Sequence, residues 1–439
     1  MRRAALFTFL LLWAPSCGGS RPPPSPPPKP AWTRYAEALE ATGLAQREVG
    51  RRWFAAGDRA VAEAAAIDPP YIERVYFSPI EPDARGFEVQ LRRGQRLVID
   101  LKQAEGNAAG DLFVDLFAPA FNETKPPVHL LGVERQAHVE LEAKWDGPVF
   151  VRVQPEIFGG GRYDVEITRG PSVGFPVQDH DARAVKSFFG APRDGGARRH
   201  EGVDIFADKG TPIVSVSDGI VMRTGNDRLG GKVVWVLDRD RRLGFYYAHL
   251  DTQAVRRGAR VKRGDLLGTV GNTGNAIHTP SHLHFGIYAP RAVDPFPFIE
   301  EAQRRPAPLR ADADLAGAWL RVRSRRAKLV DAPAGRALVK RDLARATAAR
   351  ALGSSGDWTF VALPDGERGF LPRRAVEPVE KPVRRLKAAS RAMEVLDSPR
   401  EDAVSTATTT HRPIAILAEF DGYWLVEHGG GSAWIRAMP

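Results

Sequence analysis

Histidine is scarce in this chain, yet four of its ten histidines in 439 residues fall in three short segments. These segments are His200-Glu201-Gly202-Val203-Asp204, Tyr246-Tyr247-Ala248-His249-Leu250 and His282-Leu283-His284-Phe285. Imidazole and carboxylate groups are common ligands of transition metals. A fold that brings the three segments together would therefore gather several imidazoles and one carboxylate around a single point, and such a cluster predicts a metal site.

The segment around His282 and His284 favours a strand. Leu283, Phe285 and Tyr288 are good strand formers. Residues i and i+2 of a strand point to the same face of the sheet, so both imidazoles are expected to enter one groove.

His200 and Asp204 are four residues apart, a spacing that would also place them on one face of a helix. Gly202 lies between them and disfavours a helix, and Val203 and Ile205 favour an extended chain. We therefore expect a loop that runs into a strand, with the metal drawing the two side chains together.

Two imidazoles and one carboxylate suit Zn²⁺ in a catalytic site, which keeps a fourth position for water. A purely structural zinc site usually has four protein ligands, often cysteines. The chain has a single cysteine, Cys17, which also excludes an intramolecular disulfide. A water-activating site is therefore favoured, although any one of these motifs alone is a weak signal.

The order of the motifs is more specific than any one of them. It runs Gly202-Val203-Asp204-Ile205, Gly210-Thr211-Pro212, Asp218-Gly219-Ile220-Val221, Tyr247-Ala248-His249-Leu250, Gly264-Asp265-Leu266-Leu267-Gly268 and His282-Leu283-His284-Phe285. This series resembles the lysostaphin/LytM family of zinc metallopeptidases, which cleave peptide cross-bridges of bacterial peptidoglycan. The resemblance covers roughly residues 185–297 and implies a LytM-type β catalytic domain at 175–300.

The resemblance also implies roles for five residues. His200, Asp204 and His284 match the metal ligands and would hold one Zn²⁺ per chain. His249 and His282 match the catalytic histidines. One of them would move the proton of the attacking water and the other would stabilise the oxyanion, and the sequence leaves open which does which.

The amino terminus resembles a bacterial lipoprotein signal, at residues 1–17. A basic start precedes the apolar run 4–13, which is too short to span a bilayer. Cys17 follows in a lipobox-like position and is the predicted lipidation site. Ordinary signal cleavage after Ser16 is the alternative. Lipidation implies a periplasmic protein anchored to a membrane, which we expect to be the outer membrane. Ordinary cleavage implies a secreted protein.

Three further regions are expected ahead of the catalytic domain, and the fold class is mainly β. A proline-rich linker at 18–30 leads to a helical segment at 31–68, which Pro69-Pro70 ends. Alternating strands predict an antiparallel β-sandwich accessory domain at 71–170, with strands at 87–91, 97–101, 112–116, 149–153 and 163–167.

The carboxy-terminal part contains a diverged repeat, in which a turn is followed by an aromatic strand and a second strand. Trp358 and Trp434 mark its two copies. The repeat resembles bacterial SH3-like modules, small β-barrels that we place at 312–378 and 382–439 and that imply cell-wall binding. In the simpler alternative, the two tryptophans only fill small cores.

The composition agrees with an envelope protein of several domains. The net charge of +10 favours anionic surfaces. Because the chain begins with a signal-like segment, we expect this anionic partner to be peptidoglycan and not nucleic acid. The leading hypothesis is a zinc-dependent peptidoglycan endopeptidase. The alternative is a non-catalytic LytM-type regulator that activates another hydrolase such as an amidase. The oligomeric state stays open.

Overall fold

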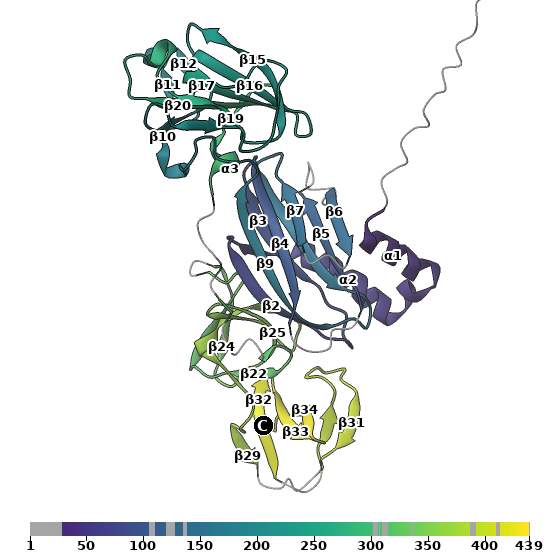
Figure 1. The fold of residues 1–439 in the computed structure, drawn as a ribbon. Coiled ribbons are helices and arrows are strands. Elements are labelled where there is room, and N and C mark those ends of the chain that lie inside the picture. The colour runs from purple at the N-terminus through teal and green to yellow at the C-terminus, as the bar shows by residue number, and fades with distance from the viewer. Residues whose placement is uncertain are drawn as a thin grey trace, which may run out of the picture.

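The computed structural model describes residues 29–438 except 105–109, 120–127, 135–137, 302–305, 307, 310–314, 335–336, 387–391 and 410–412. Strands dominate the described chain, which confirms the mainly β fold class (Figure 1). The expected signal segment, Cys17 and most of the proline-rich linker lie outside the described residues. Among the helices of the described part, none combines the length and the hydrophobicity that a membrane span needs.

The amino-terminal helical region is shorter than the sequence suggests. It contains α1 (Ala31–Ala41), the 3₁₀ turn η1 (Leu44–Gln46) and α2 (Glu48–Ala62). Residues Ala65–Ile67, expected to be helical, form strand β1 instead and pair in parallel with β3 (Arg85–Leu91). Ala65 and Ile67 are buried and the residue between them is exposed, a period of two that suits a sheet edge and not a helix.

The helices pack on one face of a β-sandwich. Its first sheet has the order β1-β3-β8-β5-β6, and its second contains β2-β9-β4-β7. The remaining bounds are β2 (Tyr71–Phe77), β4 (Gln95–Gln103), β5 (Leu112–Ala118), β6 (Val128–Glu134), β7 (His138–Glu142), β8 (Gly147–Pro155) and β9 (Gly161–Pro171). All pairs except β1–β3 are antiparallel, and strands occupy all five segments in which they were expected.

The next region is built on one large sheet of order β10-β13-β20-β17-β16-β15-β18, in which β19 also pairs with β17 and β14 pairs with β19. The bounds are β10 (Val185–Ser187), β11 (Pro192–Arg193), β12 (Arg198–Arg199), β13 (Val203–Phe206), β14 (Pro212–Val214), β15 (Gly219–Asp227), β16 (Gly231–Asp238), β17 (Leu243–Gln253), β18 (Arg260–Val261), β19 (Leu266–Val270), β20 (His282–Tyr288), β21 (Ala292–Val293) and α3 (Phe296–Ile299). Its core draws only on residues between Val173 and Ile299, so it is independent of the other cores.

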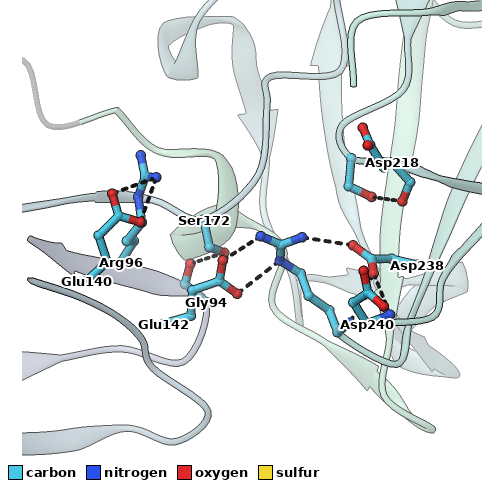
Figure 2. Close-up of polar contacts among 10 residues, drawn as sticks. Gly94, Arg96, Glu140, Glu142, Ser172, Asp218, Asp238 and Asp240 are labelled. Atoms are coloured by element: carbon cyan, nitrogen blue, oxygen red, sulfur yellow. Dashed lines mark hydrogen bonds and ion pairs between the residues drawn. The ribbon is translucent and has the colours of Figure 1, made fainter. Parts of the chain in front are cut away.

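Polar contacts join this region to the sandwich at the far end of β7. Glu142 faces Asp238 across the seam (Figure 2), and Arg241 lies between them, donating to Glu142 Oε2 at 2.9 Å and to Asp238 Oδ2 at 3.0 Å. Beside them, Ser172 Oγ donates to the Gly94 carbonyl at 2.6 Å. The first contact ties the turn between β16 and β17 to the sandwich, and the second ties the segment that enters the region.

The carboxy-terminal part begins with β22 (Trp319–Val322), β23 (Arg326–Val330), β24 (Val339–Ala344), β25 (Ala348–Ser355), β26 (Trp358–Ala362), β27 (Arg368–Pro372) and β28 (Val376–Pro378). β25 pairs antiparallel with β2 of the sandwich, at Arg74↔Ser354 and Val75↔Gly353. These strands therefore continue the second sheet of the sandwich into one sheet of 11 strands (Figure 1).

A last sheet of six strands follows: β29 (Arg384–Leu386), β30 (Glu394–Leu396), β31 (Ser405–Thr408), β32 (Ile414–Phe420), β33 (Tyr423–His428) and β34 (Gly431–Arg436). It shares a core with the preceding strands, in which Trp434 is buried and lies 5.6 Å from Trp319 between ring centroids. Trp358 is only partly buried, beside Phe360 and Phe370. Strand pairing closes neither sheet into a barrel in the described residues, so the SH3-like assignment stays a prediction.

Candidate active site

Three adjacent elements bring the predicted site residues together. β13 and β20 are antiparallel neighbours, and Asp204 and His284 are directly opposite in their register. On the other side of β20, Ala248 of β17 is opposite His284, which places His249 next to the same point. His200 lies in the loop between β12 and β13, where its backbone N–H donates to the Ala191 carbonyl at 2.8 Å. The expected loop before the strand is present.

His200, Asp204 and His284 form a group that could hold a metal ion, with one ligand atom from each residue, all within 4.8 Å of one another. His200 Nε2 lies 2.9 Å from His284 Nδ1, and Asp204 Oδ1 lies 3.0 Å from each of them. Ligand atoms bound to one zinc at about 2 Å and at tetrahedral angles are roughly 3.3 Å apart, close to this spacing. The donor set thus fits zinc with three protein ligands.

The second nitrogen of His200 fixes its tautomer. His200 Nδ1 lies 3.0 Å from the Phe188 carbonyl oxygen, which can only accept, so Nδ1 carries the proton. The Nε2 lone pair is therefore directed at Asp204 and His284. Metal-binding histidines commonly donate their other N–H to a carbonyl in this way, because the bond fixes the ring orientation.

His249 and His282 are tied to the backbone through Nδ1 as well. His249 donates to the Thr273 carbonyl at 2.8 Å and His282 donates to the Pro280 carbonyl at 2.9 Å. Their rings lie 5.0 Å apart between centroids, and His249 lies 6.0 Å from His284. In the neutral form, each ring therefore presents Nε2 as a proton acceptor.

His249 is held in an uncommon backbone conformation, with φ of 63°. For a residue with a side chain, the left-handed region costs on the order of 1 kcal/mol or more and persists where the surroundings impose it. Here the backbone N–H of His249 donates to the Gly230 carbonyl at 2.7 Å, which holds the residue at the end of the β16–β17 pairing. Such strain is common at functional sites.

Burial sets the charge of the site. Desolvation lowers the pKa of His249 to about 4, outweighing the hydrogen bond to Thr273. Desolvation also lowers the pKa of His284, against the neighbouring Asp204 carboxylate that raises it. Burial alone would raise the pKa of Asp204, but the neighbouring His200 and His284 hold it below its usual range. Both imidazoles are therefore neutral near pH 7, as ligands and proton acceptors must be.

The five predicted residues line one cavity of about 670 Å³. Its other lining residues include four basic side chains, one acidic side chain and two tyrosines: Lys186, Arg193, Arg198, Arg199, Glu201, Tyr246 and Tyr288. A larger cavity of about 920 Å³ lies beside β22 and β28, but its lining contains no histidine or cysteine. The chemistry therefore assigns the candidate active site to the smaller cavity.

Two residues of the site have no signal in the sequence. Arg193 Nη2 donates to Asp204 Oδ2 at 2.5 Å and to Ser187 Oγ at 2.7 Å. A single arginine in a glycine-rich segment has no motif of its own. It is close to Asp204 only because a short hairpin folds it back over β13.

Residues 198–295 match the model of peptidase family M23. This part of the chain is an M23 peptidase domain. The lysostaphin/LytM-like catalytic domain expected from the sequence is thereby confirmed, together with a His-Asp-His group at the three expected positions.

Relatives of this M23 domain include peptidases and an activator. The chain is 33% identical to the L-Ala–D-Glu endopeptidase of Bacillus subtilis, over 30% of this chain and 44% of the relative. It is 34% identical to lysostaphin of Staphylococcus simulans, over 24% of this chain and 22% of the relative. The solved catalytic domain of that lysostaphin is 32% identical and covers 26% of this chain and 89% of its own, at a TM-score of 0.24.

A third relative is the murein hydrolase activator NlpD of Salmonella dublin, 34% identical over 28% of this chain and 30% of the relative. The chain thus spans less than half the length of each of these curated relatives. The similarity is shared by enzymes and by a protein named as an activator.

Proposed function

We propose that the chain is a zinc-dependent endopeptidase that hydrolyses peptide cross-bridges of bacterial peptidoglycan. The observation that carries this proposal is the convergence of three ligand atoms within 4.8 Å, beside two further histidines whose Nε2 atoms are free to accept a proton. The names of the Bacillus and Staphylococcus relatives support the substrate class.

His200, Asp204 and His284 would hold the metal. A bound Zn²⁺ supplies Lewis-acid polarisation of a carbonyl and lowers the pKa of water to about 7. The remaining chemistry falls to His249 and His282. A neutral ring with Nδ1–H tied to a carbonyl accepts a proton at Nε2, and only the resulting imidazolium donates from that atom. The ring that takes the proton of the attacking water therefore becomes the group that can return it to the leaving amine.

Purified sacculi test the proposal directly. The mature protein should release muropeptides with a newly cleaved peptide bond, identified by mass spectrometry. A chelator should abolish the release and added zinc should restore it. Release that persists at full rate in chelator would contradict the metal mechanism.

The alternative is a non-catalytic regulator that activates another wall hydrolase, and the similarity to the Salmonella activator favours it. Such regulators typically lack metal ligands, whereas the ligand set is intact here. The two functions separate in one assay. A regulator would leave sacculi intact alone and would accelerate digestion only when an amidase is added.

We further propose that Cys17 is lipidated and anchors the mature protein on the periplasmic side of a membrane. The support is the position of this single cysteine behind a signal-like apolar run and ahead of the proline-rich linker. Cys17→Ala should move the protein from the membrane fraction to the soluble fraction or stall its processing. Unchanged membrane association would point to another anchor.

We also propose that the carboxy-terminal strands form SH3-like modules that bind wall polymer, while the β-sandwich positions the peptidase domain. The diverged repeat around Trp358 and Trp434 supports the first part. The polar seam at Glu142 supports the second. A protein with the peptidase ligands replaced should still sediment with sacculi, and failure to sediment would contradict wall binding.

A further inference from the structure

The two oxygens of Asp204 face different partners. Oδ1 lies 3.0 Å from His200 Nε2 and 3.0 Å from His284 Nδ1, so it belongs to the metal group. Oδ2 accepts a hydrogen bond from Arg193 Nη2 at 2.5 Å. The carboxylate therefore has Oδ1 beside the other two ligand atoms and Oδ2 bonded to a guanidinium.

Arg193 is held from two directions. It lies on β11, which pairs with β12, and β12 leads directly into the ligand His200. Its Nη2 also donates to Ser187 Oγ at 2.7 Å. Ser187 is the cross-strand partner of Asp204 in the pairing of β10 with β13. One short hairpin thus carries a ligand at its end and a cation that contacts another ligand.

We propose that Arg193, oriented by Ser187, is a positioning residue for the metal site. It fixes Asp204 so that Oδ1 alone faces the metal, and it draws negative charge away from the carboxylate. Residues that hydrogen-bond to metal ligands orient them and tune the metal, and their loss typically costs 10–100-fold in metal affinity or activity. The inference rests on the proposed zinc site but not on any substrate.

The test measures zinc affinity by competition with a chromogenic chelator. Arg193→Met, which keeps the length of the side chain, should weaken binding by about 10–100-fold. Arg199→Met is the matched control, because Arg199 lies on the same hairpin and lines the same cavity but donates to the Gly190 carbonyl at 3.2 Å. Its zinc affinity should equal that of the wild type.

Two further measurements separate positioning from general stability. The absorption spectrum of the Co²⁺-loaded protein should change in Arg193→Met, because the ligand geometry changes, and should be unaltered in Arg199→Met. Arg193→Lys should show intermediate affinity, since an ammonium can bond to Oδ2 but lacks the planar guanidinium. If Arg193→Met does not fold, the Arg193→Lys result carries the test.

Wild-type zinc affinity and an unaltered Co²⁺ spectrum in the Arg193 variants would overturn the inference. Equal weakening by Arg199→Met would overturn it too, because the effect would then be one of general charge. Neither outcome involves sacculi. A wild-type protein that binds zinc but cleaves no wall would refute the proposed function and leave this inference standing.

Discussion

Asp204 and His284 contribute the two strand-borne ligand atoms of the group, and Asp204 is buried while His284 is partly buried. Asp204→Ala or His284→Ala should therefore remove bound zinc, measured by elemental analysis after dialysis, where the wild type should hold about one Zn²⁺ per chain. His278→Ala is the control, because His278 is exposed and lies outside the cavity lining. Full zinc occupancy in both ligand variants would show that the assignment of ligands is wrong.

His249 and His282 bond to carbonyls through Nδ1, as the ligand His200 does, but they do not belong to the group of three ligand atoms. His249→Ala and His282→Ala should keep zinc and reduce kcat/KM on a soluble wall peptide by about 10²–10⁴-fold, the usual contribution of general acid–base catalysis. Elemental analysis provides the matched control. Undiminished turnover by either variant would exclude that histidine from the reaction.

The low pKa of His249 also predicts how the metal-free protein responds to acid. Its pKa is lowered by burial to about 4 in the fold, below an ordinary value of about 6.5, so the unfolded chain binds the proton first. Stability should therefore fall as the pH drops from about 6.5 to about 4, by at most about 3 kcal/mol. Urea denaturation at several pH values measures it, and His249→Gln should flatten this part of the profile. Equal slopes would contradict the burial effect.

At the scale of the elements, Gly202 permits β13 and β20 to approach at the site. A Cβ at this position would lie 2.5 Å from the Phe285 carbonyl oxygen and 2.7 Å from His284 Cε1. Gly202→Ala should therefore displace His284 and weaken zinc binding. Gly225→Ala on β15 is the control, since its Cβ would have no contact nearer than 3.8 Å. Chelator competition compares the two, and equal zinc affinity would show that the strands can shift without cost.

The sequence predicted the site residues well because each of the motifs that contain them spans only a few residues. The alternation around His282 and His284 indicated a strand with both rings on one face, and β20 has this form. The register that sets Asp204 opposite His284 could not be read from the sequence, because pairing depends on segments 80 residues apart. Arg193 was missed because no motif marks the short hairpin that brings it to Asp204, 11 residues along the chain.

The errors at the scale of elements also come from distant contacts. The alanine-rich stretch after α2 favours a helix locally, but Ala65–Ile67 gains backbone hydrogen bonds by pairing with β3. The pairing of β25 with β2 joins segments on either side of the peptidase domain, and nothing in either strand alone indicates the partner. Five expected strands of the sandwich were found because alternation is itself local.

At the scale of the whole molecule, the last sheet cannot be removed without exposing the core that it shares. Trp434 and Leu417 pack with Leu320 and Leu329 in one cluster. Trp434→Ala should cost about 3–5 kcal/mol of stability in this part of the molecule. Zinc occupancy should stay unchanged, because the peptidase core is separate. Denaturation followed by tryptophan fluorescence measures the loss, and a parallel loss of zinc would show that the two cores are coupled.

The strand pair β2–β25 has a consequence for how the chain is divided. The 11-stranded sheet contains strands up to Pro171 and strands from Trp319 onward, and the peptidase domain lies between them in the chain. The peptidase domain is therefore inserted between two segments that form one continuous sheet. A single protease cut on either side of it would leave it attached through the other connection. A second cut would release the peptidase domain, and the 11-stranded sheet would keep all of its strands.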